Sequence, residues 1–148
     1  MRLLVQRVRQ ASVFAEGACI GSIEHGLLVF MGVGSNDTSD DVTHLAGKLL
    51  KLRVFEDDQG HLNRSLEEVS GRVLVVSQFT LYGDCRKGNR PSFTAAASSK
   101  MGEQFYHEFL NALRAFGTDP ESGRFGANMQ VELLNDGPMT LWLESEGR

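Results

Sequence analysis

A short polar segment follows one of the most apolar runs in the chain. Ser77-Gln78-Phe79-Thr80 comes directly after Val73–Val76, so hydroxyl and amide groups stand where a buried strand closes. Main-chain N–H groups at such a strand end, here those of Phe79 and Thr80, can stabilise the negative charge that develops on oxygen when an ester is hydrolysed. Thr80 could also be a nucleophile, but no histidine or lysine lies near it in sequence to activate the hydroxyl, so an auxiliary role is favoured.

Ser77 and Gln78 are expected to position a substrate through hydrogen bonds. The alternative is that these polar side chains pair within the strand end, since polar groups on a buried strand need partners in any case.

A second segment, Asn135–Thr140, places Gly137-Pro138 between two apolar runs. Glycine lets another molecule approach the backbone closely, and an X-Pro bond can be held cis at a cost of only about 0.5–1 kcal/mol. Taken alone, the segment is more typical of a hairpin turn, with Pro138 starting an edge strand. Its occurrence together with the first segment favours a functional interpretation.

Other chemistries find little support. Gly32-Val33-Gly34 follows a predicted strand, but the third glycine of a dinucleotide-binding loop would fall at Asp37. The segment from His107 to Asn111 lacks the second histidine of a zinc protease, and no serine sits in a GxSxG turn. The four histidines are scattered, and each is more typical of a structural residue. We therefore expect no metal and no cofactor.

The composition indicates one globular domain over residues 1–148. The chain has 41% hydrophobic and 23% charged residues, and its length is that of a single core. No apolar run is long enough for a membrane span or a secretory signal, so a soluble cytoplasmic protein is expected, with Cys19 and Cys85 reduced. A net charge of -4 argues against a protein that coats nucleic acid non-specifically, although it allows a local basic patch.

Hydrophobic periodicity predicts an α/β fold. Strands are expected over Leu3–Val13, Cys19–Ile23 and Gly26–Gly34, the last one central because it is apolar on both faces. The spacing predicts a helix from Thr38 to Arg53, in which Thr38 and Asp41 resemble a weakened capping box, and then a turn over Phe55–Gly60.

The second half of the chain continues this pattern. A strand is expected over Arg72–Leu81 and a helix over Ser98–Phe116, which Gly117 ends. The last two strands, Met129–Leu134 and Met139–Leu143, are predicted to form a hairpin.

The two polar segments together resemble a known pair of motifs. Ser77-Gln78-Phe79-Thr80-Leu81 and Asn135-Asp136-Gly137-Pro138-Met139-Thr140 are similar to the signatures of the D-aminoacyl-tRNA deacylases of the bacterial and eukaryotic type. Further matching stretches run from the first strand to the last: Gln6–Val8, Ala11–Val13, Arg90–Phe93, Gly123–Ala127 and Met129–Val131. Met139 replaces a different apolar residue that is common in the family, which is a minor departure.

The resemblance implies a metal-free homodimer with a barrel-like sheet and two main helices. Its members hydrolyse the ester between a D-amino acid and the terminal ribose of tRNA, with the active site at the subunit interface. Carried over here, Ser77, Gln78, Phe79 and Thr80 line the catalytic pocket, and a cis Gly137-Pro138 peptide enters the pocket of the partner. The two carbonyls receive the substrate amino group and leave no volume for an L side chain, so glycine would be admitted. The ribose hydroxyl beside the ester is implied to orient or activate the water.

Contacts with the RNA are expected from aromatic and basic residues. Phe79, Phe125 and Met129 could flank the terminal adenine, although the last two could equally be core. Phosphates could be met by two basic groups, Arg86, Lys87 and Arg90 in one loop and Arg2, Arg7 and Arg9 in the first strand, or these could be solvated surface charges. The competing hypothesis from another class is a non-catalytic nucleic-acid-binding module on the same fold.

Overall fold

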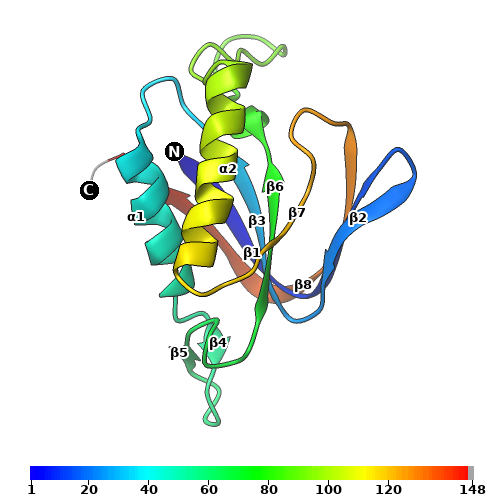
Figure 1. The fold of residues 1–148 in the computed structure, drawn as a ribbon, viewed down its shortest axis with the longest axis vertical. Helices are drawn as coiled ribbons and strands as arrows, with labels where there is room; N and C mark the ends of the chain where they lie inside the picture. The colour runs from blue at the N-terminus through cyan, green and yellow to red at the C-terminus, as the bar shows by residue number, and fades with distance from the viewer. Residues whose placement is uncertain (147–148) are drawn as a thin grey trace.

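A computed structural model describes residues 1–146 of the 148-residue chain. Two helices, α1 (Ser39–Leu50) and α2 (Ser99–Ala115), lie side by side against one face of a strongly curled six-stranded sheet (Figure 1). The predicted α/β class with two main helices is confirmed. No helix among the described residues is long and apolar enough to cross a membrane.

Strand β1 (Arg2–Ala15) is the element on which the sheet is built. Along one edge, its first half pairs antiparallel with β3 (Gly26–Gly32) and its second half with β2 (Ala18–Ile23). Along its other edge it pairs over nearly its whole length with β8 (Met129–Glu144). A strand of 14 residues can serve three neighbours because the sheet curls along it.

The sheet then turns back toward itself. Strand β6 (Arg72–Ser77) pairs parallel with β3, and the short β7 (Glu121–Ser122) pairs parallel with β6. Strand β2 also lies against β6 and β7. A Cβ atom at Gly21 of β2 would come within 2.9 Å of the Ser122 carbonyl oxygen, so only glycine permits this approach. The result is a nearly closed, barrel-like core, as the family resemblance implied.

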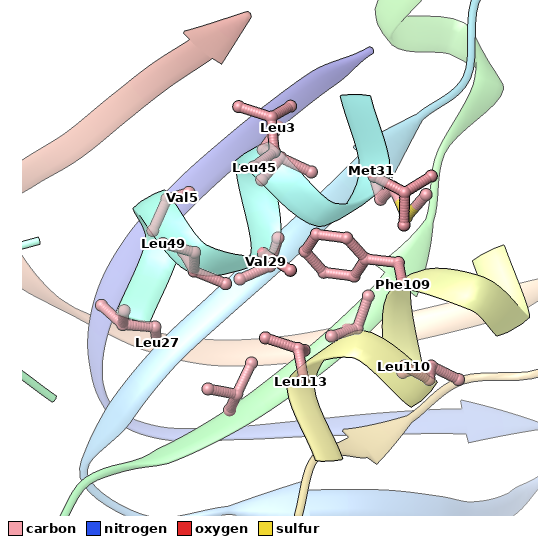
Figure 2. Packing of buried hydrophobic residues seen from close by; sticks show 14 of the residues in the cluster. Leu3, Val5, Leu27, Val29, Met31, Leu45, Leu49, Phe109, Leu110 and Leu113 are labelled. Carbon is pink, nitrogen blue, oxygen red and sulfur yellow. The ribbon is translucent and has the colours of Figure 1, made fainter. Parts of the chain in front are cut away.

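The larger core lies between the helices and the sheet. Figure 2 shows Phe109 of α2 directed toward Val29 of β3, with Leu45 and Leu49 of α1 packed beside them. Both helices begin as their capping residues predict: the Thr38 N–H donates to Asp41, and Ser98 Oγ accepts from the Met101 N–H. Gly117, with φ +91°, ends α2 as expected.

A second, smaller core fills the inside of the curl. It includes Val8 and Val13 of β1, Leu28 of β3, and Leu74 and Val76 of β6. Strands β3 and β6 are therefore buried on both faces, which confirms the prediction that Gly26–Gly34 is central, although the strand itself ends at Gly32.

Three short strands were not predicted from the sequence. The predicted turn at Phe55–Gly60 begins with β4 (Phe55–Glu56), which pairs with β5 (Leu62–Arg64) in a small hairpin. Together with β7, these strands have only two or three residues each. Such lengths are too short for an alternating pattern to be recognised.

The predicted C-terminal hairpin is wrong. Both of its arms belong to the single strand β8 and pair with the same neighbour, β1, in one direction. Val131 faces Val13, and Leu143 faces Leu3. The turn-forming residues between the arms form an outward bulge instead of reversing the chain, because the long β1 offers a partner to both arms.

Candidate active site

A cavity of about 540 Å³ opens where β6 ends beside the start of α2. Its lining brings together five of the residues predicted from sequence: Ser77, Gln78, Phe79, Phe125 and Met129. They come from two segments almost 50 positions apart in the numbering, which the parallel pairing of β6 with β3 and the return of the chain through β7 place side by side.

The segment after Ser77 does not continue as a strand, so the predicted extension of β6 to Leu81 is wrong. The Gln78 N–H makes one more hydrogen bond, to the Met31 carbonyl at 2.7 Å, and the chain then enters a 3-10 turn, η1 (Phe79–Tyr82). The Leu81 N–H closes this turn on the Gln78 carbonyl at 3.2 Å. The first N–H groups of such a turn, those of Phe79 and Thr80, have no acceptor within it. They can therefore donate to a bound ligand.

The side chains of the turn are exposed. Phe79 is 58% exposed and meets the edge of Phe93, with ring centroids 5.1 Å apart. The Thr80 hydroxyl oxygen accepts a hydrogen bond from the Gln78 side-chain amide, and Thr80 itself lies beside the cavity rather than in its lining. Gln78 thus fixes the orientation of the hydroxyl that the sequence suggested as an auxiliary group.

Aromatic and apolar side chains form another part of the lining. Phe125 packs against Tyr106 of α2, with ring centroids 6.0 Å apart, and Met129 lies next to it along the lining. The Tyr106 hydroxyl donates to the Val75 carbonyl at 2.9 Å, and burial raises the pKa of this phenol to about 12. Tyr106 therefore stays neutral near pH 7 and serves the wall as a packed, hydrogen-bonded ring.

Tyr106 also lines the cavity, although the sequence did not single it out. The sequence feature that could have pointed to it is a phenolic hydroxyl on the buried face of a helix, where a polar atom must find a partner.

Gly137 and Pro138 lie on the bulge of β8, outside the lining of this cavity. Gln6 of β1 faces Thr140, whereas Val8, two residues later, already faces Asn135, so β8 carries extra residues between these pairs. Gly137 and Pro138 are both exposed, and the peptide bond between them is cis, as expected from the family resemblance.

Arg7 of β1 holds the bulge in place through hydrogen bonds. Its side chain is buried, with Nε donating to the Asp136 carbonyl at 3.1 Å and Nη1 donating to the Val54 carbonyl at 2.5 Å. In return, the Asn135 side-chain amide donates to the Arg7 carbonyl at 2.9 Å. The prediction that Arg7 meets RNA phosphates is wrong, because its guanidinium is occupied inside the protein. The sequence feature that could have predicted its burial is its position two residues after Val5, on the inward face of the strand.

Three large apolar side chains of β8 are exposed. Within residues 1–146, β1 is the one strand that pairs with β8. Leu133, Leu134 and Trp142 on β8 are 38%, 51% and 46% exposed. A long, unpaired strand edge with exposed apolar side chains is a surface that proteins normally cover.

Known proteins that are similar to this chain identify its family. The family model described as D-Tyr-tRNA(Tyr) deacylase matches residues 4–144. The D-aminoacyl-tRNA deacylase of Chloroherpeton thalassium is 55% identical over 98% of this chain and 96% of its own, and that of Thermosipho africanus is 50% identical over 99% and 98%.

Two solved structures share the fold. The c-Myc DNA Unwinding Element Binding Protein superposes with a TM-score of 0.93 at 42% identity over 98% of this chain and 99% of that one. A probable eukaryotic D-amino acid tRNA deacylase has a TM-score of 0.83 at 21% identity over 96% and 97%. From the family match and the full-length relatives, the chain belongs to the D-Tyr-tRNA(Tyr) deacylase family, which comprises hydrolases of the aminoacyl-tRNA ester bond, as the sequence indicated.

Proposed function

We propose that the cavity between η1 and α2 holds the aminoacylated 3′-terminal adenosine of a D-aminoacyl-tRNA and hydrolyses its ester. The observation that carries the proposal is the convergence of Ser77, Gln78 and Phe79 with Phe125 and Met129 around one cavity of about 540 Å³. That volume lies within the range of small-molecule sites. Its apolar wall suits an unstacked base, and its polar rim suits the ester.

At the ester, water attacks the carbonyl carbon, and the bond from that carbon to the ribose oxygen breaks. The N–H groups of Phe79 and Thr80 stabilise the oxyanion in between, while Ser77 and Gln78 position the substrate. The departing ribose oxygen takes up a proton, which leaves a free D-amino acid and intact tRNA. The vicinal ribose hydroxyl orients the attacking water, and Thr80, held by Gln78, assists without forming a covalent bond.

Chirality is read by Gly137-Pro138 of a second subunit, whose carbonyls receive the substrate amino group. Two observations support a shared site in a homodimer. The bulge is exposed and lies outside its own subunit's cavity, and three large apolar side chains on the same strand, Leu133, Leu134 and Trp142, are also exposed. A two-fold axis would give two equivalent sites, each completed by the other subunit.

A main-chain wall at the α-carbon rejects L substrates whatever their side chain, so the enzyme tolerates many D-amino acids. Glycine has no side chain to exclude, so glycyl-tRNA is also cleaved. We place this activity in the cytoplasm as quality control of translation, carried out by a single domain over residues 1–148.

A non-catalytic nucleic-acid-binding function is the second candidate, because one of the two similar structures is that of a DNA Unwinding Element Binding Protein. Such a module would bind tRNA and leave the ester intact. The two functions therefore differ in one measurable product, the released amino acid.

The test compares D- and L-tyrosyl-tRNA, and a second, aliphatic pair, under single-turnover conditions. Release of both D-amino acids at rates at least a hundredfold above the L rates is expected. Comparable rates for the two enantiomers would refute the selection at the α-carbon, and tRNA binding without release of amino acid would favour the binding module. Addition of EDTA should leave the D rates unchanged.

A further inference from the structure

The loop that follows η1 carries a concentration of positive charge in an otherwise acidic chain. Three basic side chains, Arg86, Lys87 and Arg90, stand against one acid, Asp84, within ten residues, whereas the whole chain has a net charge of -4. All three basic residues are exposed. The loop lies at one end of the long axis of the molecule, opposite the β4–β5 hairpin (Figure 1).

The three cations are not equivalent. Arg86 is held by Asp84 through two hydrogen bonds, from Nε at 2.9 Å and from Nη2 at 2.7 Å. This contact holds the pKa of the Asp84 carboxyl well below its usual range. Lys87 and Arg90 have no ion pair with any residue among positions 1–146. Arg86 is thus part of the loop's own structure, and the other two charges remain available to a ligand.

The base of the loop is fixed to the catalytic turn. Asp84 and Ser92 exchange two backbone hydrogen bonds, at 2.7 and 3.0 Å, which closes the loop at its base. The Gly83 N–H donates to the Thr80 carbonyl at 2.9 Å, and Phe93 packs against Phe79 with ring centroids 5.1 Å apart. The charged tip is therefore tied to the residues that line the cavity.

We propose that Lys87 and Arg90 bind backbone phosphates of the tRNA acceptor end while its terminal adenosine occupies the cavity. The inference rests on the active site proposed above. RNA is the one part of that substrate with a repeated negative charge, and phosphate contacts of lysine and arginine position a nucleic acid without reading its sequence. A polar hollow beside the loop, whose lining includes Asp84, Ser92 and Thr94, offers further hydroxyl donors next to these cations.

The test uses the double variant Lys87→Ala/Arg90→Ala and the control Lys48→Ala/Lys51→Ala. The control removes the same charge from exposed positions at the end of α1, toward the β4–β5 hairpin. Each protein is assayed with D-tyrosyl-tRNA and with D-tyrosyl-adenosine, which has no phosphate. Binding of uncharged tRNA is measured separately by fluorescence anisotropy over a range of salt concentrations.

We expect the loop variant to lose at least tenfold in kcat/KM on D-tyrosyl-tRNA at low salt and nothing on D-tyrosyl-adenosine. Its plot of log affinity for tRNA against log salt should be shallower by about 1.5, because two phosphate contacts are gone. The control should match the wild type.

Equal losses on both substrates, or an unchanged salt slope, would overturn the proposal. The proposal would also be overturned if Lys87 and Arg90 bound a DNA duplex more tightly than they bind tRNA. A wild type inactive on both substrates would refute the proposed function, whereas the anisotropy arm would still test the loop.

Discussion

The Arg7 guanidinium and the Asp136 carboxylate lie 3.2 Å apart, although 129 residues separate them in the chain. The contact ties the middle of β1 to the bulge of β8 that carries Gly137 and Pro138. Because Arg7 also donates to the Val54 carbonyl, one buried side chain joins three segments of the protein. The position of the proposed chirality-reading peptide therefore depends on a residue from the first strand.

Replacing Arg7 by alanine should destabilise the fold and misplace the bulge. The substitution leaves the Val54 and Asp136 carbonyls without their donor. A buried polar group left unsatisfied typically costs about 1–3 kcal/mol, so urea unfolding should show a loss of at least that order. Arg9 provides the matched control, since it also lies near Asp136, at 3.5 Å, but its side chain is 71% exposed. Arg9→Ala should change the free energy of unfolding by less than about 1 kcal/mol. Equal effects of the two substitutions would contradict the assigned role of Arg7.

Gly137→Ala should lower activity at least tenfold without affecting stability. A Cβ atom at this position would have as its nearest neighbour Asn135 Oδ1 at 3.5 Å, an ordinary van der Waals contact within the subunit. The added methyl would instead occupy the cavity of the second subunit, and we expect kcat/KM to fall at least tenfold at an unchanged melting temperature. Gly47→Ala, whose Cβ would also find only ordinary contacts, should retain full activity. A stable and fully active Gly137→Ala enzyme would refute the proposed wall.

Thr80→Ala should retain most of the activity, with a loss of less than about tenfold. The substitution removes the hydroxyl but keeps the Thr80 N–H. We assign oxyanion stabilisation to this N–H, and a donor to the oxyanion contributes more to the rate than an auxiliary hydroxyl does. Single-turnover rates on D-tyrosyl-tRNA measure the effect, and Thr80→Ser controls for the shape of the side chain. Complete inactivity of a folded, substrate-binding Thr80→Ala variant would favour threonine as the nucleophile.

Activity should require two subunits. A Gly137→Ala variant mixed with a Gln78→Ala variant, each impaired alone, should form heterodimers in which one site combines an intact bulge with an intact cavity. Random exchange of subunits would restore about a quarter of the wild-type activity, since half of the dimers carry one intact site. Subunit exchange is verified by two affinity tags. A fully active monomer in sedimentation experiments, or no recovery in verified heterodimers, would show that each chain builds its own site.

The two motifs could be recognised from the local sequence alone. The residues 77–81 and 135–140 stand out because polar, glycine and proline residues interrupt apolar runs, and this contrast needs no knowledge of the fold. The helices α1 and α2 are equally visible because their hydrophobic period repeats often enough to be recognised, and β3 is visible as a continuous apolar run between glycines. Strands of two or three residues, such as β4 and β7, offer no such repeat.

The sequence by itself determined the α/β class, the two helices, the central strand and five of the residues that line the cavity. Only the tertiary structure decided that residues 135–140 bulge from one continuous strand, since a turn-forming sequence reverses the chain unless a neighbour such as β1 pairs with both flanks. It likewise decided that Arg7 is buried against Asp136 while Lys87 and Arg90 remain free of ion pairs within the described residues. A charged side chain looks the same in the sequence whether it meets a partner or solvent, and its partner here comes from the other end of the chain.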